Sequence, residues 1–173
     1  MGVTVVVLVA VFFLTRSDSA SSQGIDNIKI AKPVVEKAVD QSFEFPIRDS
    51  KGEEVSKLKI TVEKASLEKE IVVKGKKNTA VDGRVFLILN LKVQNSYDKS
   101  VDIKTRDYFR LSVNGNDQEW LAPEIHNDPV TIQAISTKLT RVGFILYEKD
   151  KNPILQIGEI NGQKEKVELN LKN

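Results

Sequence analysis

The chain has 173 residues, of which 29% are charged, and its formal net charge is +2. This length suits one domain with a sizeable core and an additional segment, and the near-neutral balance argues against a dedicated nucleic-acid binder, which needs a clustered basic face. The chain contains no cysteine, so disulfides, cysteine-ligated zinc, a cysteine nucleophile and a lipidated cysteine are excluded. Its single histidine leaves few ways to build a histidine-dependent active site.

The first segment, Gly2–Leu14, is apolar except for Thr4. As a helix it would cover about two thirds of a hydrocarbon core about 30 Å thick, close to the length of a signal-peptide hydrophobic region. No basic residue precedes the run, and Arg16 follows it, which favours the orientation opposite to that of an export signal. One explanation is a true start upstream of Met1. We interpret residues 1–14 as a signal peptide or membrane anchor, with a buried core segment as the alternative.

Residues 15–41 are predicted to form a polar linker or stalk. Thr15–Gln23 consists of small and polar residues, which suit a flexible tether. The small residues of Ala20–Ser22 also fit a signal-peptidase site, although cleavage is not decided. Ile25–Gln41 is ambiguous, because Pro33 is compatible with a helix start or with an extended lead-in. We assign it to the stalk and place the folded domain at residues 42–173.

From Ser42 onward, apolar and polar residues alternate with the period of a β-strand. Residues 43–47 predict a strand at a sheet edge, because Pro46 cannot donate a ladder hydrogen bond. In residues 58–67 the alternation slips by one position, which predicts a β-bulge. Residues 71–73 predict a short strand, and residues 74–82 a polar loop.

Residues 85–94 are predicted to be the central strand. Their odd positions form one apolar face, and the other face changes from Phe86 and Ile88 to polar residues. A strand that is buried on both faces at one end lies in the middle of a sheet. Further strands are predicted at residues 101–104 and 107–113, and Asn114-Gly115 predicts a type I′ hairpin turn.

The rest of the chain continues the strand pattern. Strands are predicted at residues 118–121, 132–147 (one long strand or a pair), 154–160 and 167–171, with a loop at residues 122–129 and a tight hairpin at Asn161-Gly162. About nine short strands with regular turn signals and no convincing helix predict an all-β sandwich.

The segment GRVFLILNLKVQNSYDKSVDIKTRDYFRL resembles the telokin-like, immunoglobulin-like extracellular domain family of unknown function. The resemblance rests on a hydrophobic strand ending in Leu91–Asn95, a short turn and the strand Asp107–Leu111, and ISTKLTRVGFILYE resembles the closing strand of the family. It covers Leu58–Leu171. It implies an exported or surface immunoglobulin-like β-sandwich without assigned catalysis. The chain departs from the family in lacking the lipid-anchoring cysteine that many exported members place before the domain.

Two loops contain residues that could bind a metal. His126 lies beside Asn127 and Asp128, with Glu124 before it, but one histidine with scattered carboxylates is a poor set for a transition metal. We favour a loop histidine that bonds backbone groups. The other loop offers possible calcium ligands but too few carboxylates, so a hairpin turn is favoured there. Its residues are Asn114, Asn116 and Asp117.

Three further groups of residues were considered for function. A basic patch could meet anionic polymer or lipid head groups, although we favour lysines that protect a sheet edge. An aromatic group could form an exposed binding surface, but packing in the core or at its rim is favoured. A Ser–Lys pair lacks a nucleophile elbow. The basic patch consists of Lys74, Lys76 and Lys77. The aromatic group consists of Tyr108, Phe109 and Trp120, and the Ser–Lys pair lies in Ser136, Thr137 and Lys138.

The sequence therefore predicts no catalytic, cofactor-binding or metal-binding residues. We predict an exported, membrane-tethered, non-enzymatic module at the extracytoplasmic face of the membrane, where it binds a protein or cell-envelope component but no nucleic acid. Residues 1–14 provide the contact with the membrane in this prediction, and the oligomeric state is left open. The alternatives are a structural subunit of a surface assembly, and an envelope enzyme or metal-binding protein that uses His126.

Overall fold

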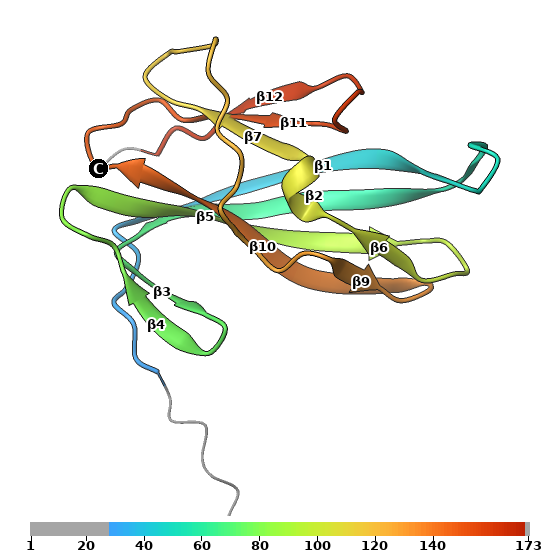
Figure 1. Ribbon diagram of the computed structural model, residues 1–173, viewed down its shortest axis with the longest axis horizontal. Coiled ribbons are helices and arrows are strands. Elements are labelled where there is room, and N and C mark those ends of the chain that lie inside the picture. The colour runs from blue at the N-terminus through green and yellow to red at the C-terminus, as the bar shows by residue number, and fades with distance from the viewer. Residues whose placement is uncertain (1–27, 172–173) are drawn as a thin grey trace, which may run out of the picture.

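The computed structural model describes residues 28–171, and its largest element is a five-stranded antiparallel sheet (Figure 1). The strand order is β1-β2-β5-β10-β8, so β5 is the central strand, as the sequence predicts. Pro46 lies on the edge strand β1, also as predicted. The strands are β1 (Val35–Arg48), β2 (Glu54–Glu68), β5 (Arg84–Asn95), β10 (Ser136–Tyr147) and β8 (Ile125–His126).

A second, three-stranded sheet in the order β12-β11-β7 packs on one face of the larger sheet. Its strands are β7 (Phe109–Ser112), β11 (Ile154–Ile157) and β12 (Glu165–Glu168). Apolar side chains of both sheets form one continuous core, to which β5 contributes every second residue. Two packed sheets around one core make the protein an all-β sandwich.

Two small antiparallel pairs complete the fold. One consists of β6 (Val101–Ile103) and β9 (Val130–Ile132), and it adds Ile103, Val130 and Ile132 to the core. The other is the hairpin β3 (Glu70–Val73) and β4 (Lys76–Thr79), which lies against the outer face of the larger sheet, opposite the second sheet. A short 3-10 turn, η1 (Thr105–Asp107), connects β6 to β7.

The β3–β4 hairpin buries the second face of the central strand. Phe86 and Ile88 point away from the main core, and both are at most 8% exposed because Ile71 of β3 packs on them. Farther along β5, Asn90 and Lys92 occupy this outer face. The transition from apolar to polar residues on this face therefore coincides with the part of β5 that the hairpin covers.

Local backbone conformation sets the turns. Asn114 and Gly115 have φ of 59° and 69°, and the Asn116 N–H donates to the Val113 carbonyl at 3.0 Å, as expected for the predicted type I′ turn. Lys74 and Gly75 have φ of 50° and 72°, so the turn that closes the β3–β4 hairpin also has positive φ at both central residues. The predicted slip in residues 58–67 is also confirmed, since the register of β2 against β5 shifts between residues 62 and 64.

Several predicted boundaries are wrong. The first strand begins at Val35, inside the segment assigned to the stalk, because residues 35–38 pair with β2. The polar loop at residues 74–82 contains the strand β4, and the loop at residues 122–129 contains β8. These strands depend on pairing with distant residues, which local sequence pattern does not show.

Other predicted elements differ in detail. The predicted strand at residues 107–113 begins as η1, and the returning strand at residues 118–121 is reduced to one bridge between Leu111 and Leu121. At Asn161-Gly162 a turn is closed by the Gly162 N–H and the Glu159 carbonyl at 3.0 Å, so Gly162 ends this turn instead of occupying its centre. Residues 28–171 contain twelve strands where about nine were predicted, and four of them contain twelve or more residues.

The predicted signal or anchor, Gly2–Leu14, and the linker Thr15–Gln23 lie outside the described residues. Within residues 28–171, no helix has the length and apolar character needed to cross a bilayer.

We expect core and surface leucines to differ sharply in their contribution to stability. Leu89 is fully buried in β5, whereas Leu139 on β10 is 67% exposed. Leu89→Ala should lower the free energy of unfolding by about 2–5 kcal/mol, because it leaves a cavity in the core. Leu139→Ala should change it by no more than about 0.5 kcal/mol. Urea unfolding followed by Trp120 fluorescence measures both, and equal losses would contradict the assignment of the two faces.

Candidate functional site

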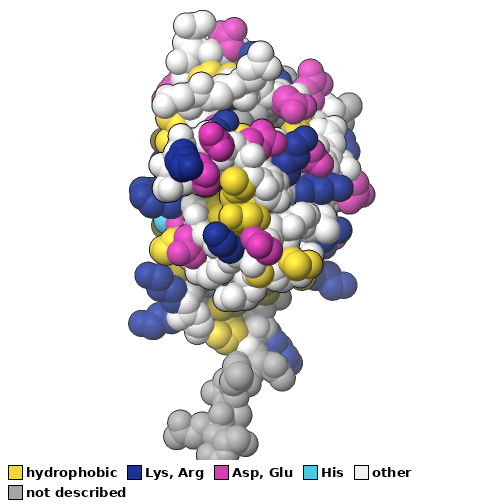
Figure 2. All heavy atoms as spheres, turned by 90° about the vertical axis from the view of Figure 1, so that its right-hand side faces the viewer, with side chains coloured by type: hydrophobic (Ala, Val, Ile, Leu, Met, Phe, Trp, Pro, Cys, Tyr) yellow, Lys and Arg dark blue, Asp and Glu magenta, His cyan; other side chains and the backbone are white. Residues whose placement is uncertain are grey.

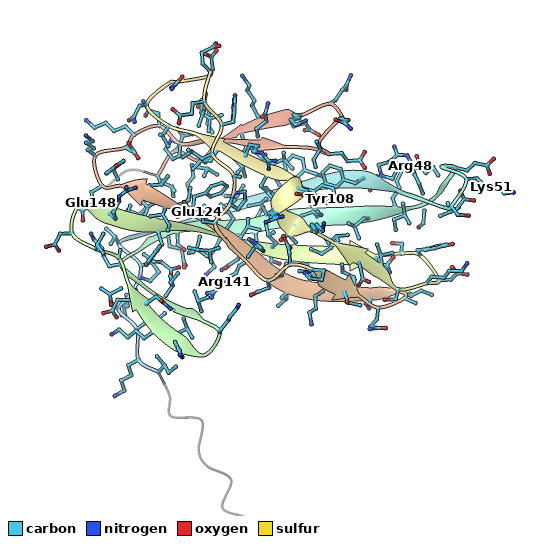
Figure 3. All side chains as sticks on the ribbon, viewed as in Figure 1. Arg48, Lys51, Tyr108, Glu124, Arg141 and Glu148 are labelled. Carbon is cyan, nitrogen blue, oxygen red and sulfur yellow. The ribbon has the colours of Figure 1, made fainter. Side chains whose placement is uncertain are left out.

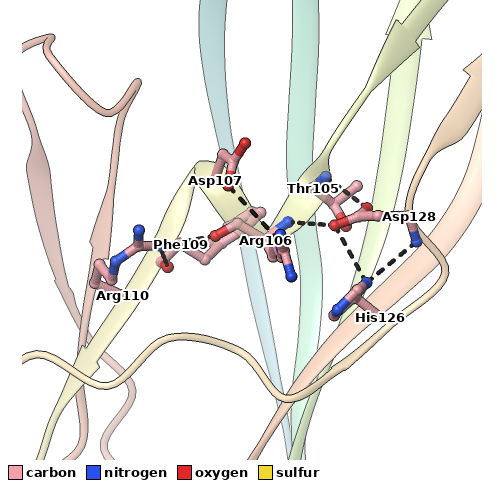
Figure 4. Close-up of polar contacts among 7 residues, drawn as sticks. All are labelled: Thr105, Arg106, Asp107, Phe109, Arg110, His126 and Asp128. Atoms are coloured by element: carbon pink, nitrogen blue, oxygen red, sulfur yellow. Dashed lines mark hydrogen bonds and ion pairs between the residues drawn. The ribbon is translucent and has the colours of Figure 1, made fainter.

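The carboxylate of Asp128 organises a polar cluster between η1 and the connection from β8 to β9 (Figure 4). Its Oδ1 accepts hydrogen bonds from the Thr105 N–H at 2.6 Å and the Thr105 hydroxyl at 2.5 Å, and its Oδ2 accepts one from the Arg106 N–H at 3.0 Å. The Asp128 side chain is only 5% exposed. These contacts fasten the first residues of η1 to the connection between β8 and β9, which is a structural role.

His126 lies beside this cluster. Its Nδ1 is 3.3 Å from the Asp128 Oδ2 and accepts a hydrogen bond from the Asp128 N–H at the same distance. The Asp128 carboxylate is committed to η1, and Glu124 instead lines a groove beside β8. Within residues 28–171, no three histidine, aspartate or glutamate side chains gather as a metal site would require. Of the four residues considered, the structure brings together His126 and Asp128.

The second set of possible metal ligands also has structural contacts. The Asn114 side-chain amide donates to Asp150 Oδ1 at 2.8 Å, and its oxygen accepts from the Lys151 N–H at 2.9 Å. The Asn116 oxygen accepts from the Gln118 N–H at 3.1 Å. These bonds tie the turn after β7 to the loop after β10, in agreement with the favoured interpretation as a turn.

Of the three aromatic residues, Phe109 belongs to the core and Tyr108 packs against it. Phe109 is fully buried, and Tyr108 packs on Phe45 with ring centroids 4.7 Å apart. The Trp120 indole N–H donates to the Asp117 carbonyl at 2.9 Å. Burial raises the pKa of Tyr108 above its usual value, and the negative charges of Glu159 and Asp107 add to the effect while Arg48 opposes it.

At the Ser–Lys pair that the sequence disfavours, the Ser136 hydroxyl donates to the Gln133 carbonyl at 2.8 Å. The lysines of the basic patch lie on the β3–β4 hairpin. Lys76 and Lys77 belong to β4, whereas Lys74 occupies the turn. Lys77 pairs with Glu70 at 2.8 Å, and this contact together with the Ala31 N–H lowers the pKa of Glu70.

The candidate binding site is a groove of about 590 Å³ between this hairpin and the outer face of the larger sheet. We call it the hairpin groove. Its walls are mostly apolar, with polar side chains at the rim, and its apolar part continues the small cluster that buries Phe86. The lining residues are Ile71, Val73, Asn78, Thr79, Ala80, Val81, Arg84, Phe86, Glu124, Ile125 and Ile145.

Two of the strands that line the hairpin groove, β4 and β8, lie at sheet edges. In the described part of the chain, β4 pairs with β3 alone and β8 pairs with β10 alone. Because alternate residues of an edge strand point their main-chain groups away from the sheet, β4 presents amides and carbonyls beside an apolar groove. Arg141 holds the hairpin in place, since its guanidinium on β10 donates to the Val72 carbonyl (Figure 3).

Two other hollows of similar size have ion pairs among their lining residues. One, of about 570 Å³, lies at the end of the sandwich, where Lys69 pairs with Glu148. The other, of about 690 Å³, lies beside Tyr108, where Arg48 pairs with Glu159 at 3.2 Å. These two hollows are lined by several charged side chains, whereas the lining of the hairpin groove is mostly apolar, so the hairpin groove is the stronger candidate for binding an apolar segment.

The sequence pattern does not predict the hairpin groove, because residues 74–82 have the composition of a polar loop. The signal that could have revealed it is Lys74-Gly75, a turn dipeptide that directly follows the strand Ile71–Val73. The four residues of β4 are all exposed and polar, so they carry no alternating pattern.

The described structure is thus a β-sandwich with a candidate binding groove. No protein-family model and no curated protein matches the sequence. A conserved hypothetical protein from Bacillus anthracis has a similar structure, with a TM-score of 0.54 and 13% identity over 79% of this chain and 100% of that chain. An uncharacterized β-sandwich protein from Clostridium difficile matches with a TM-score of 0.49 and 18% identity, over 65% of this chain and 85% of that chain.

At this level of identity, the likeness to the Bacillus anthracis protein shows a shared fold alone. The narrower resemblance to the telokin-like family stays a prediction.

Replacing Asp128 tests its structural role. Asp128→Ala should lower the free energy of unfolding by about 1–3 kcal/mol, because the N–H groups of Thr105 and Arg106 lose their acceptor. His126→Ala should cost about 1 kcal/mol or less, since it removes one neutral hydrogen bond. Both values follow from urea unfolding. A larger loss for His126→Ala, or a wild-type stability that depends on a chelator, would instead support a metal site.

The raised pKa of Tyr108 predicts a loss of stability at alkaline pH. Because the folded-state pKa lies above the unfolded one, this stability is present below about pH 10 and is lost as the pH rises further. The free energy of unfolding should therefore fall as the pH rises above about 10, and Tyr108→Phe should reduce that fall. Tyr147→Phe, at a ring that is 47% exposed, provides the control. An unchanged pH profile for Tyr108→Phe would contradict the prediction.

Proposed function

We propose that this protein is an exported, membrane-tethered, immunoglobulin-like module that binds a partner protein without catalysing a reaction. Residues 1–14 are the tether, and the described β-sandwich is the binding domain. The observation that supports the proposal is the hairpin groove, a mostly apolar hollow whose lining includes residues of two edge strands. The occupant we propose is an extended segment of the partner that carries apolar side chains.

The chemistry of the groove favours such a segment. An extended peptide can add to an exposed strand edge through main-chain hydrogen bonds while its alternate side chains enter pockets. In the hairpin groove, β4 offers the edge, and Ile125 and Ile145 offer apolar contact on the opposite wall. Both isoleucines are half-buried, so a bound side chain would remove additional apolar surface from water.

The charges of β4 disfavour a second copy of this chain as the occupant. Pairing two β4 strands would bring the lysines at positions 76 and 77 close to those of the other copy, and like charges on neighbouring strands are destabilising. Lysines on edge strands commonly prevent such pairing. A different protein is therefore the favoured partner.

A photoreactive residue in the groove tests the proposal. Val81 is 71% exposed and lines the groove, whereas Leu139 is 67% exposed on the same outer face but does not. In intact cells that express the full chain, a photoreactive phenylalanine analogue at position 81 should give a discrete cross-linked product with another protein, and the analogue at position 139 should not. Ile125→Glu should abolish this product, because it places a charge in the groove wall.

The product also separates the alternatives. A species with twice the mass of this chain would support a subunit of a self-assembly in place of a partner-binding module. Equal cross-linking from positions 81 and 139, or a product that survives Ile125→Glu, would contradict binding in the hairpin groove.

A further inference from the structure

One side of the molecule gathers lysines from two segments that are distant in the sequence. The first is the lead-in segment, residues 28–34, and the second is the β3–β4 hairpin. The Ala31 N–H donates to Glu70 Oε2 at 2.8 Å, and the Val34 N–H donates to the Leu67 carbonyl at 2.7 Å, so the lead-in segment is fastened beside the hairpin. We call this surface the lysine face. It consists of Ile28, Lys29, Ile30, Lys32, Lys74, Lys76 and Lys77.

The net positive charge of the lysine face is larger than the net charge of the entire chain. Residues 28–34 and 70–79 contain five lysines and one glutamate, a net charge of +4, whereas the complete sequence has +2. The remainder of the chain is therefore slightly acidic. In addition, Glu70 is engaged by Lys77 and by the Ala31 N–H. The excess charge is thus a local property of this face.

Exposed apolar side chains accompany these lysines. Ile28 is 39% exposed and Ile30 is 42% exposed, and they alternate with Lys29 and lie close to Lys32 in the sequence. A solvent-exposed stretch that alternates isoleucine with lysine is poorly suited to contact with water alone. Apolar side chains combined with basic ones are typical of surfaces that lie in the interface of an anionic membrane.

The position of the lysine face agrees with such a contact. Figure 1 shows the lead-in segment and the β3–β4 hairpin on the side of the larger sheet opposite β7, β11 and β12. In Figure 2, which views the molecule from the end with the β1–β2 turn, Lys and Arg side chains project on both sides of the lower part. The lead-in segment is also where the described chain continues toward the apolar residues 1–14.

We infer that the lysine face binds the anionic lipid head groups of the membrane to which the protein is tethered, so that the hairpin side of the sandwich faces the bilayer. The inference deepens the proposed function and rests on its membrane tether. The tether alone would leave the domain free to rotate on its linker, and the lysines add an attraction that selects one side. Each lysine near an anionic surface strengthens attachment by about fivefold, so the three hairpin lysines together contribute roughly a hundredfold.

Energy transfer from single labelled cysteines to acceptor-labelled lipids measures this orientation in the full chain. The natural chain has no cysteine, so each introduced one is unique. Ala31→Cys places the dye on the lysine face, and Asp117→Cys places it in the exposed loop after β7. The vesicles contain phosphatidylcholine with or without phosphatidylglycerol. We expect stronger transfer from position 31 than from position 117 in the anionic vesicles, and a loss of this difference at high salt.

Charge substitutions assign the effect to named residues. Replacing Lys74, Lys76 and Lys77 by glutamine should remove the difference in energy transfer between the two dyes. When residues 1–14 are not inserted in the bilayer, the same replacement should lower the affinity for anionic vesicles by roughly a hundredfold. The same change at Lys51, Lys57 and Lys59, near the β1–β2 turn, should leave the difference intact. All six side chains lie on the surface, so folding is preserved in both variants.

The outcomes separate the orientation from the tether. Attachment to both kinds of vesicle with equal transfer from positions 31 and 117 would overturn the lysine face and leave the tether standing. Attachment that requires phosphatidylglycerol and the hairpin lysines would support the lysine face and overturn the tether. An unchanged difference in the Lys74, Lys76 and Lys77 variant would show that the hairpin lysines protect only the strand edge, and would overturn the inference.

Discussion

The fold depends on burying both faces of β5. Its neighbours β2 and β10 pair with it along nearly its whole length, and its odd-numbered residues fill the core between the two sheets. The other face begins with Phe86 and Ile88, and burial of each such side chain stabilises the fold by about 1.5–3 kcal/mol. The second sheet cannot reach this face, because it packs on the opposite one. The β3–β4 hairpin supplies the cover, and this explains why a small two-stranded element lies outside the sandwich.

The location of the candidate site follows from the same requirement. The hairpin covers only the apolar part of the outer face, and β8 extends the sheet by just two residues beyond β10. An uncovered apolar strip, to which Ile145 contributes, is therefore left between the hairpin and β8. The strands on its two sides are edges for different reasons: β4 ends a two-stranded hairpin, and β8 ends the five-stranded sheet. An apolar strip next to unpaired main-chain groups combines the two features that strand addition requires.

The sequence predicted those features that depend on local pattern. The central strand, the edge position of Pro46 and the bulge in β2 follow from alternation and from the chemistry of proline, which act over a few residues. The start of β1, the strand β4 and the groove depend on pairing between segments that are distant in the sequence. Val35–Ala38 resembles a helix start until its pairing with β2 is known. Likewise, Asp128 is a candidate metal ligand in the sequence because it lies near His126. Its structural role is hidden there, because the N–H donors of Thr105 and Arg106 are more than twenty residues away.

The exposure of β4 accounts for the charge of the hairpin. None of its four side chains fills the core, so packing places no demand on their identity, and lysines can serve other purposes at these positions. One purpose is local, because positive charge on a strand edge hinders pairing with a second copy. In the proposed orientation the other purpose concerns the whole face, where the same lysines and those of the lead-in segment would attract an anionic surface. The two purposes are compatible, since both require charge that remains in water when no partner is bound. With the lysine face toward the bilayer, the hairpin groove would lie near the membrane, where segments of neighbouring membrane proteins are the most accessible partners.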